Sequence, residues 1–164
     1  MDTFNRSGVP KEEPIEYIRS TQPFIFRRRV LWGECDPAGV VYTPRFVDFA
    51  SIASQHFLGH LLGAGFTESK RSNNFGTPCK ALSLIFHSSL RPDQIFDMNV
   101  YVKTIGTTTF TLGIAGTASD GTSIFDATFT VITVQPSDRS AIVVPTQLRN
   151  ALKPYVRDSQ SQDQ

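Results

Sequence analysis

One long amphipathic helix followed by four strand-like segments constrains the fold of this 164-residue chain more than any other feature. Apolar residues recur at spacings of three and four from residue 44 to about 62, which predicts a helix with one apolar face. The residues on this face are Phe46, Phe49, Ala50, Ala53, Phe57 and Leu61. Because this is the one large element able to cover a sheet, we expect a single layer of strands packed against it.

The segments after this helix have the composition of β-strands, being rich in Thr, Val, Ile and Phe. They span about 79–90, 94–105, 107–119 and 122–134. Apolar and polar residues alternate between Phe96 and Lys103, which indicates one buried face. Turn signals at Pro92-Asp93, Ile105-Gly106 and Asp120-Gly121 separate the segments, so neighbouring strands should form antiparallel hairpins.

Three shorter elements complete the prediction, namely a strand over 24–32, a strand near 141–144 and a helix near 146–153. The fold class is α+β, a curved antiparallel sheet wrapped around one long central helix. We expect one domain over residues 23–156. Residues 1–22 form an extended or partly disordered arm with a helical turn at 15–19, and 157–164 form a polar tail. Exposed sheet edges make edge-to-edge dimerisation a natural outcome.

Charge and hydropathy exclude several classes of function. The chain has 16 Lys and Arg against 15 Asp and Glu, so its net charge of +1 gives no reason to expect nucleic acid or a charged membrane surface as a partner. Its apolar runs are far shorter than the roughly 20 residues of a membrane-spanning helix. The N-terminus lacks the apolar core of a secretory signal, and we therefore expect a cytoplasmic protein.

The loop before the long helix carries the clearest chemical signal. Asp36 is followed by Pro37, which restrains it to extended geometry, and Gly39 allows a positive φ. Thr43-Pro44 is typical of a helix start, with Thr43 as the N-cap. The first N–H groups of a helix lack internal partners and lie at the positive end of its dipole. A carboxylate beside such groups suits acyl transfer.

The segment Gly33-Glu34-Cys35-Asp36-Pro37-Ala38-Gly39-Val40-Val41-Tyr42 closely resembles the loop of hotdog-fold thioesterases of the 4-hydroxybenzoyl-CoA thioesterase type. The similarity extends through Gly76-Thr77-Pro78, Arg91-Pro92 and residues 103–110 to the closing strand and helix. The resemblance implies a hotdog fold and an acyl-CoA thioesterase that releases a carboxylate and free coenzyme A. It also implies a homo-oligomer, a dimer or commonly a tetramer built from dimers, with active sites at the dimer interface and coenzyme A lying across subunits.

Site residues follow from this resemblance. Asp36 would attack the thioester or activate water to do so, and the backbone N–H of Thr43 would polarise the thioester carbonyl. The helix borders the acyl pocket in this family, so Phe49 and Ser51, together with Tyr42, are candidates for contacts to the substrate. Ser51 stands where the hydroxybenzoyl enzyme has a carboxylate that binds the ring hydroxyl. Our first expectation for the substrate is an arylcarbonyl-CoA, such as a hydroxybenzoyl-CoA, and our second is a short aliphatic acyl-CoA.

The residues that bind coenzyme A are predicted less directly. Where the hydroxybenzoyl enzyme has a basic cluster near the coenzyme A phosphates, this chain has Gly106-Thr107-Thr108. We therefore expect the nucleotide to be held by Lys103, Arg91, Thr108 and Thr109, or by residues of a partner subunit. Coenzyme A enters as part of the substrate, and we expect no separate cofactor.

Other readings of the same residues stay open. Asp36 is also compatible with a plain turn residue, and a non-catalytic acyl-CoA-binding hotdog protein would have the same fold. A hotdog dehydratase would need an active histidine with a Gly and Pro spacing that this chain lacks. His56 and His60 have no third ligand for a metal, so no metal is expected. Cys35 has no base identifiable from the sequence, which favours packing over nucleophilic chemistry.

The short basic run Arg27-Arg28-Arg29 lies in the predicted first strand. We interpret it as a solvated edge with salt bridges. A contact from one of these arginines to a phosphate is the alternative.

Overall fold

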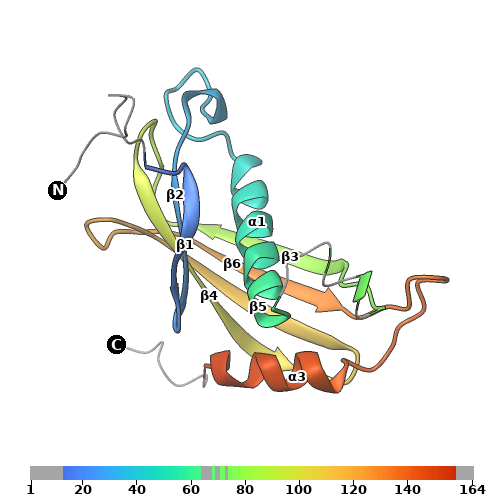
Figure 1. Cartoon of the computed structure of the whole chain (residues 1–164). Coiled ribbons are helices and arrows are strands. Elements are labelled where there is room, and N and C mark those ends of the chain that lie inside the picture. Colours follow the sequence, from blue (N-terminus) through green and yellow to red (C-terminus); the bar gives the residue numbers. More distant parts are fainter. Residues whose placement is uncertain (1–12, 64–67, 69–70, 73, 158–164) are drawn as a thin grey trace, which may run out of the picture.

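The computed structural model describes residues 13–63, 68, 71–72 and 74–157. Six strands form one antiparallel sheet in the spatial order β1-β2-β4-β5-β6-β3 (Figure 1). In chain order they are β1 (Glu16–Thr21), β2 (Phe24–Arg29), β3 (Cys79–Phe86), β4 (Ile95–Ile105), β5 (Thr109–Ala118) and β6 (Ser123–Ile132). The helices are η1 (Trp32–Glu34), α1 (Arg45–Leu61), α3 (Thr146–Leu152) and η2 (Lys153–Tyr155). The predicted hotdog arrangement, a curved antiparallel sheet around one long helix, is confirmed.

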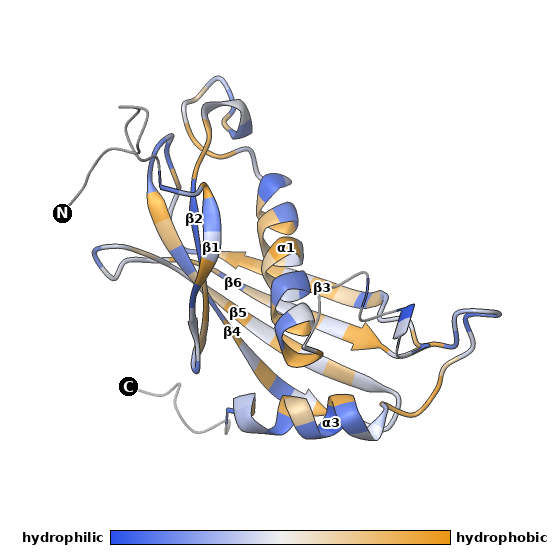
Figure 2. Ribbon diagram, viewed as in Figure 1, coloured by the Kyte–Doolittle hydropathy of each residue, from blue (hydrophilic) through white to orange (hydrophobic). Residues whose placement is uncertain are grey.

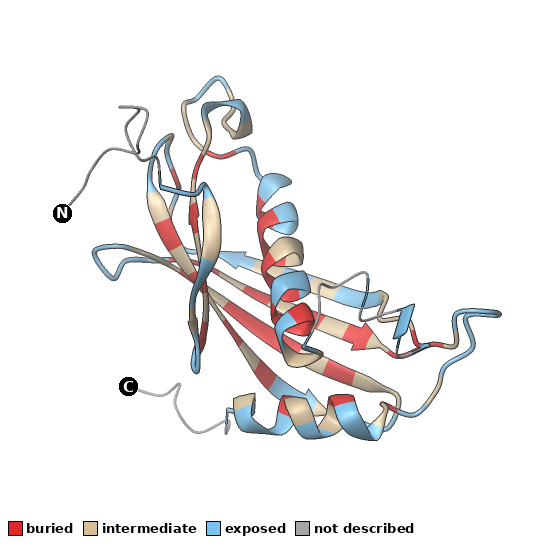
Figure 3. Cartoon of the chain, in the orientation of Figure 1, coloured by how far each residue is buried: buried red, intermediate tan, exposed pale blue. Residues whose placement is uncertain are grey.

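Helix α1 packs its apolar side on the sheet, as its sequence pattern predicts. It begins and ends within one residue of the predicted bounds. Phe49, Ala53 and Phe57 are at most 1% exposed, and Figure 3 shows that the buried positions of α1 face the strands. Full burial of each such Phe contributes about 1.5–3 kcal/mol. The core between α1 and the sheet therefore fixes the direction of the helix and the place of its N-terminus.

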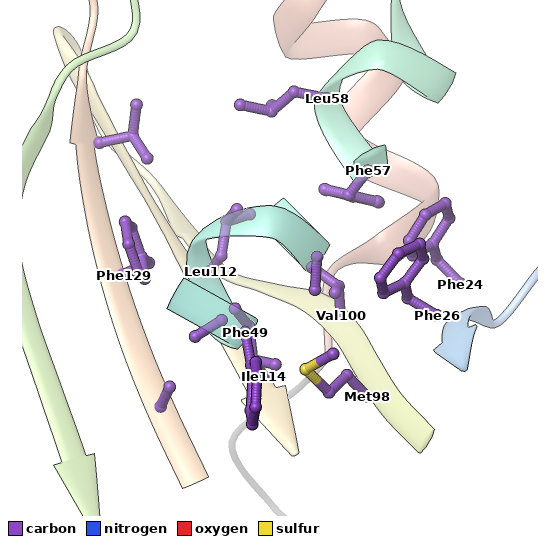
Figure 4. Close-up of a cluster of buried hydrophobic side chains, with 14 of the residues drawn as sticks. Phe24, Phe26, Phe49, Phe57, Leu58, Met98, Val100, Leu112, Ile114 and Phe129 are labelled. Atoms are coloured by element: carbon purple, nitrogen blue, oxygen red, sulfur yellow. The ribbon is translucent and has the colours of Figure 1, made fainter. Parts of the chain in front are cut away.

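The strands supply the other half of this core. Along β4, residues 96, 98, 100 and 102 are buried while their neighbours are more exposed, which confirms the predicted alternation. Figure 4 shows Met98, Val100, Leu112 and Ile114 of β4 and β5 beside the α1 side chains, and apolar positions alternate with polar ones along the strands in Figure 2. On β2, Phe24 packs edge-on against Phe57, with ring centroids 5.2 Å apart.

The predicted reversals all form. Gly121 has φ +88° and stands between β5 and β6, where the Asp120 carboxylate accepts a hydrogen bond from the Thr122 N–H at 2.9 Å. The β4–β5 hairpin closes through a 2.7 Å bond from the Gly106 N–H to the Thr109 carbonyl. Asp93, with φ +64°, lies in the turn before β4.

Three predictions need correction. Residues 16–21, placed in the N-terminal arm with a helical turn at 15–19, form strand β1, because they pair along the free edge of β2. The strand predicted over 24–32 ends at Arg29, and Trp32–Glu34 turns into η1. Residues 141–144 form an isolated bridge between Ala141 and Val134 rather than a strand. Residues 1–12 of the arm and 158–164 of the tail lie outside the described residues.

In the described part of the chain β1 and β3 are the two edges of the sheet, and the β3 edge lies beside the start of α1. β3 pairs with β6 on one side and with no strand on the other. Its last two residues, Ile85 and Phe86, are 61% and 47% exposed. The Phe86 ring contacts that of Phe46 at the start of α1, with centroids 5.1 Å apart. The free edge therefore reaches the N-terminal end of the central helix.

Candidate active site

The connection from β2 to α1 is a compact loop at the N-terminal end of the helix (Figure 1). Residues 34–36 run antiparallel to residues 40–42. The Asp36 N–H donates to the Val40 carbonyl at 2.9 Å, and the Tyr42 N–H donates to the Glu34 carbonyl at 2.9 Å. The Val41 N–H donates to the Leu90 carbonyl at 2.8 Å, which attaches the loop to the segment before β4. The loop is therefore held from within and from the sheet.

Asp36 stands at the tip of this short ladder. Its carbonyl accepts the Gly39 N–H at 2.9 Å, and its Oδ1 accepts the Ala38 N–H at 2.9 Å. Gly39 has φ +76°, a conformation that favours glycine. Within the described residues, Oδ2 of Asp36 has no hydrogen-bond partner. Asp36 thus shapes the turn with one oxygen, as a turn aspartate does, and leaves the second oxygen free for chemistry.

Thr43 lies at the other end of the ladder, directly before the helix. Its carbonyl accepts the Phe46 N–H at 3.2 Å, and among the described residues its own N–H has no acceptor. The predicted side-chain cap is wrong, because the N-cap position belongs to Pro44 and no side chain caps α1. The unpaired Thr43 N–H is exposed with its residue and is available to an oxygen atom of a ligand.

A cleft of about 290 Å³ lies along the first half of α1. It is lined by Arg28, Glu34, Arg45, Asp48, Phe49, Ser51, Ile52 and Gln55. Two of the three predicted substrate contacts, Ser51 and Phe49, therefore line this cleft. Phe49 is buried beneath it. Tyr42 is 54% exposed at the base of the helix and does not line the cleft.

Arg28 and Glu34 also line this cleft, which the sequence analysis did not predict. Arg28 is 5% exposed and is ion-paired with Glu34, so its prediction as part of a solvated edge is wrong. A signal was present in the predicted strand, because residue 28 has the same parity as Phe24 and Phe26, and side chains two residues apart on a strand lie on the same face. Arg27, on the opposite face, does form the expected salt bridge, to Asp97 at 2.8 Å.

The predicted coenzyme A contacts are not brought together in one protomer. Arg91 follows Leu90, whose carbonyl accepts the Val41 N–H, so its backbone lies beside the loop that carries Asp36. Lys103, Thr108 and Thr109 lie at the other end of β4 and β5, roughly 25 Å along the strands. The Lys103 ammonium donates to the Thr128 hydroxyl at 3.3 Å, and the Thr108 carbonyl accepts the Thr133 N–H at 2.9 Å.

Cys35 is adjacent to Asp36 but is poorly suited to act as a nucleophile. Burial, and then the negative charges of Glu34 and Asp36, raises the pKa of the Cys35 thiol. A raised pKa leaves less thiolate at neutral pH, and the thiolate is the reactive form. No group of three or more His, Cys, Asp or Glu in the described ranges is placed to hold a metal.

Comparison with known proteins gives the family. A curved antiparallel sheet around one long helix is the hotdog fold, which this chain shares with a solved protein of the thioesterase superfamily. The chain belongs to the thioesterase-like superfamily, whose family model matches residues 30–152, and its enzyme class is thioesterase. This confirms the resemblance drawn from the sequence. Among curated proteins, none matches the chain significantly.

Solved structures extend this comparison. A thioesterase superfamily protein from Jannaschia sp. CCS1 is 26% identical, with a TM-score of 0.77 over 90% of this chain and 100% of that one. The 1,4-dihydroxy-2-naphthoyl-CoA thioesterase from Synechocystis is 17% identical, with a TM-score of 0.72 over 79% and 95%. A 4-hydroxybenzoyl-CoA thioesterase mutant in complex with 4-hydroxybenzoyl-CoA is 18% identical, with a TM-score of 0.69 over 78% and 96%. At these identities the last two similarities show the fold.

No helix in the part of the chain that the structure describes is both long and apolar enough to cross a membrane.

Proposed function

We propose that this thioesterase hydrolyses an acyl-CoA to a carboxylate and free coenzyme A, with Asp36 as nucleophile or general base and the Thr43 backbone N–H as the group that polarises the carbonyl. The observation that carries the proposal is the short ladder between residues 34–36 and 40–42. It connects a carboxylate with a free oxygen to an N–H with no acceptor in the described structure. Acyl transfer needs both groups at one carbonyl.

The chemistry follows from these two groups. The Thr43 N–H donates to the thioester oxygen, on which negative charge develops in the transition state. Asp36 attacks the carbonyl carbon and expels the coenzyme A thiolate, and water then hydrolyses the mixed anhydride. In the alternative route, Asp36 removes a proton from water as the water attacks the same carbon, and the thiolate leaves in the same way. Both routes require the carboxylate in one position.

For the acyl group we propose an arylcarbonyl, such as a hydroxybenzoyl group. The cleft along α1 supports this, since the hydroxyl of Ser51 and the amide of Gln55 line it above the buried Phe49 ring. A Ser hydroxyl can donate to or accept from a ring hydroxyl. The solved structures that are named as dihydroxynaphthoyl-CoA and hydroxybenzoyl-CoA thioesterases support the same class of substrate. A short aliphatic acyl-CoA is the alternative.

We also propose a homodimer formed by pairing two β3 edges, with a tetramer as two such dimers. The uncovered edge with exposed Ile85 and Phe86 supports this, because pairing would continue the antiparallel sheet. In such a dimer coenzyme A would lie across subunits. Lys103, Thr108 and Thr109, remote from Asp36 within one protomer, would then contact the coenzyme A bound at the partner's loop.

A cytoplasmic location stays a prediction from the sequence.

Replacing the Asp36 carboxylate tests the mechanism directly. Asp36→Asn keeps the oxygen that accepts the Ala38 N–H but removes the negative charge, so we expect the fold to persist and kcat to fall at least 10³-fold, on the order expected for removing the attacking group. Asp120→Asn is the matched control, because Asp120 also accepts an N–H two residues on, at 2.9 Å in a remote hairpin. An Asp36→Asn protein with most of its kcat would refute the mechanism.

The substrate is tested on a panel of thioesters by following the release of free thiol. Benzoyl-, 4-hydroxybenzoyl-, acetyl- and butyryl-CoA separate the alternatives, and we expect the highest kcat/KM with the hydroxylated aromatic group. Equal values for aromatic and aliphatic substrates would remove the aromatic assignment. Binding of acyl-CoA without hydrolysis by the unaltered protein would instead identify a non-catalytic binding protein.

A further inference from the structure

Arg28 occupies an unusual position for a charged side chain. It lies on the core face of β2, two residues after Phe26, and is 5% exposed. Its Nε is buried and has no hydrogen-bond partner in the described structure. A buried charge is costly unless it is paired, and a buried ion pair often stabilises a fold no more than an apolar residue of similar size would. Stability alone is therefore a weak explanation for this arginine.

The contacts of Arg28 converge on the proposed catalytic loop. Its Nη2 donates to Oε1 of Glu34, and its Nη1 donates to Oε2 of Glu16 on β1 at 2.7 Å. Its guanidinium carbon lies 4.3 Å from the centre of the Phe49 ring on α1. One planar group thus connects the edge strand, the loop and the central helix. Arginine suits this role because its planar guanidinium can stack on an aromatic ring with its face while it forms ion pairs through the N–H groups at its edge.

Glu34 connects Arg28 to both groups of the proposed mechanism, the Asp36 carboxylate and the Thr43 N–H. Its Oε2 accepts the Leu31 N–H at 2.9 Å, so the side chain is held from two sides. Its backbone carbonyl accepts the Tyr42 N–H at 2.9 Å, directly before Thr43. In the other direction along the chain, Asp36 is two residues away. A shift of Glu34 would therefore move the carboxylate and the Thr43 N–H relative to each other.

We propose that Arg28 is a positioning residue for the thioesterase reaction: through Glu34 and Phe49 it fixes the Asp36 loop against the start of α1 and so sets the geometry between carboxylate and carbonyl-polarising N–H. This inference rests on the proposed function of Asp36 and Thr43. Arg28 itself takes no part in bond making. Displacements of about 1 Å can cost on the order of 100-fold in rate, so a small relaxation of the loop is enough to be measured.

Arg28→Lys and Arg28→Met test the proposal, with Arg27→Met as the matched control. Arg27 is the next residue of β2 and also forms an ion pair, with Asp97 at 2.8 Å, but on the sheet face away from the loop. We expect kcat to fall about 10- to 100-fold in Arg28→Met and less in Arg28→Lys, with KM and the Kd for coenzyme A within about twofold of wild type. Arg27→Met should retain the wild-type kcat, measured well below its Tm.

Two further measurements separate positioning from stability. Glu34→Gln keeps an acceptor for the Leu31 N–H but weakens the ion pair, so we expect it to lower kcat in the same way and to be non-additive with Arg28→Met. Hydrogen exchange of the backbone over residues 35–43 should accelerate in the Arg28 variants and not in Arg27→Met. If Arg28→Met does not fold, the same measurements on Arg28→Lys and Glu34→Gln test the proposal.

Each alternative outcome has a distinct signature. A lower Tm with unchanged kcat per folded molecule would make Arg28 merely structural, and a raised KM with unchanged kcat would make it a substrate contact. Either result overturns the positioning role. If the wild type hydrolyses thioesters and Asp36→Asn does not, while the Arg28 variants are unimpaired, this inference alone fails. If the wild type hydrolyses no thioester, the proposed function fails first.

Discussion

Neighbouring arginines on β2 show how strongly position decides what a residue does. Arg27 and Arg28 are adjacent, yet their side chains point to opposite faces of the sheet. Arg27 pairs with Asp97 among polar residues on the outer face, whereas Arg28 is buried against Phe49 and pairs with Glu34 of the Asp36 loop. The same side chain therefore supports the sheet at one position and, in our proposal, the reaction geometry at the next.

Gly39 provides a test of the loop at the level of one residue. Its φ of +76° suits glycine, and a Cβ placed there meets no atom within 4 Å. The cost of Gly39→Ala should therefore come from the backbone alone, about 1–2 kcal/mol of unfolding free energy. We also expect kcat to fall, because relief of the strain moves Asp36. Thermal or urea unfolding and thioester hydrolysis measure the two effects.

Gly33→Ala is the control for this prediction. Gly33 lies in η1 in the same loop and does not have a positive φ. As at Gly39, a Cβ on this residue would meet no atom within 4 Å. We expect its stability to change by less than about 0.5 kcal/mol, which is typical of benign surface substitutions. Equal losses in the two variants would show that backbone conformation at Gly39 is not what holds the turn.

At the scale of elements, β3 is an edge strand that ends in two exposed apolar residues. A lysine at an exposed edge discourages pairing with another strand, and Ile85 is 61% exposed there. We expect Ile85→Lys to dissociate the proposed dimer and to lower activity, since the proposed coenzyme A site spans subunits. Light scattering coupled to size-exclusion chromatography measures the mass.

Val143→Lys is the matched control for the edge, because Val143 is also 61% exposed but lies outside β3, before α3. It should leave the oligomeric state and activity unchanged. An Ile85→Lys protein that keeps the mass and activity of the wild type would argue against pairing through β3. A monomer with full activity would separate the dimer from the coenzyme A site.

At the scale of the whole molecule, the ion pairs of the outer sheet face make stability depend on pH. Burial alone would raise the pKa of the Asp97 carboxyl, but hydrogen bonds and charge from Arg27, and then Arg19, outweigh it and lower the pKa below its ordinary value of 3.8. A carboxyl with a depressed pKa stabilises the fold above its unfolded pKa. That contribution is lost as the pH falls through the folded pKa.

Asp97→Asn should therefore lower the Tm at neutral pH, and the difference from wild type should shrink once the pH falls below about 4. Differential scanning calorimetry between pH 7 and about pH 2 checks both the sign and the pH range. A difference in Tm that stays constant over this range would show that the charge of Asp97 is not its source. Because Asp97 joins β4 to β1 and β2, the result reports on how these three strands are held together.

Local periodicity explains how much of the fold could be predicted. The three- and four-residue spacing of α1 and the alternation along β4 are patterns of residues close together in the chain, so both elements were predicted nearly to their ends. β1 was not, because Glu16–Thr21 has no strong alternation and becomes a strand through pairing with β2. The strand predicted at 141–144 does not form for the opposite reason. Its residues are typical of a strand, but the segment pairs only through the single bridge between Ala141 and Val134.

The sequence by itself determined the fold around one long helix, the acidic turn and the thioesterase family, because each depends on residues close together in the chain. Only the tertiary structure decided the burial of Arg28, the link from Glu34 to Tyr42, and the separation of Lys103 from Asp36. These depend on which strands pair and in which register, contacts between residues far apart in the sequence. A local pattern indicates which face a side chain occupies, whereas its partners across the sheet are set when the chain folds.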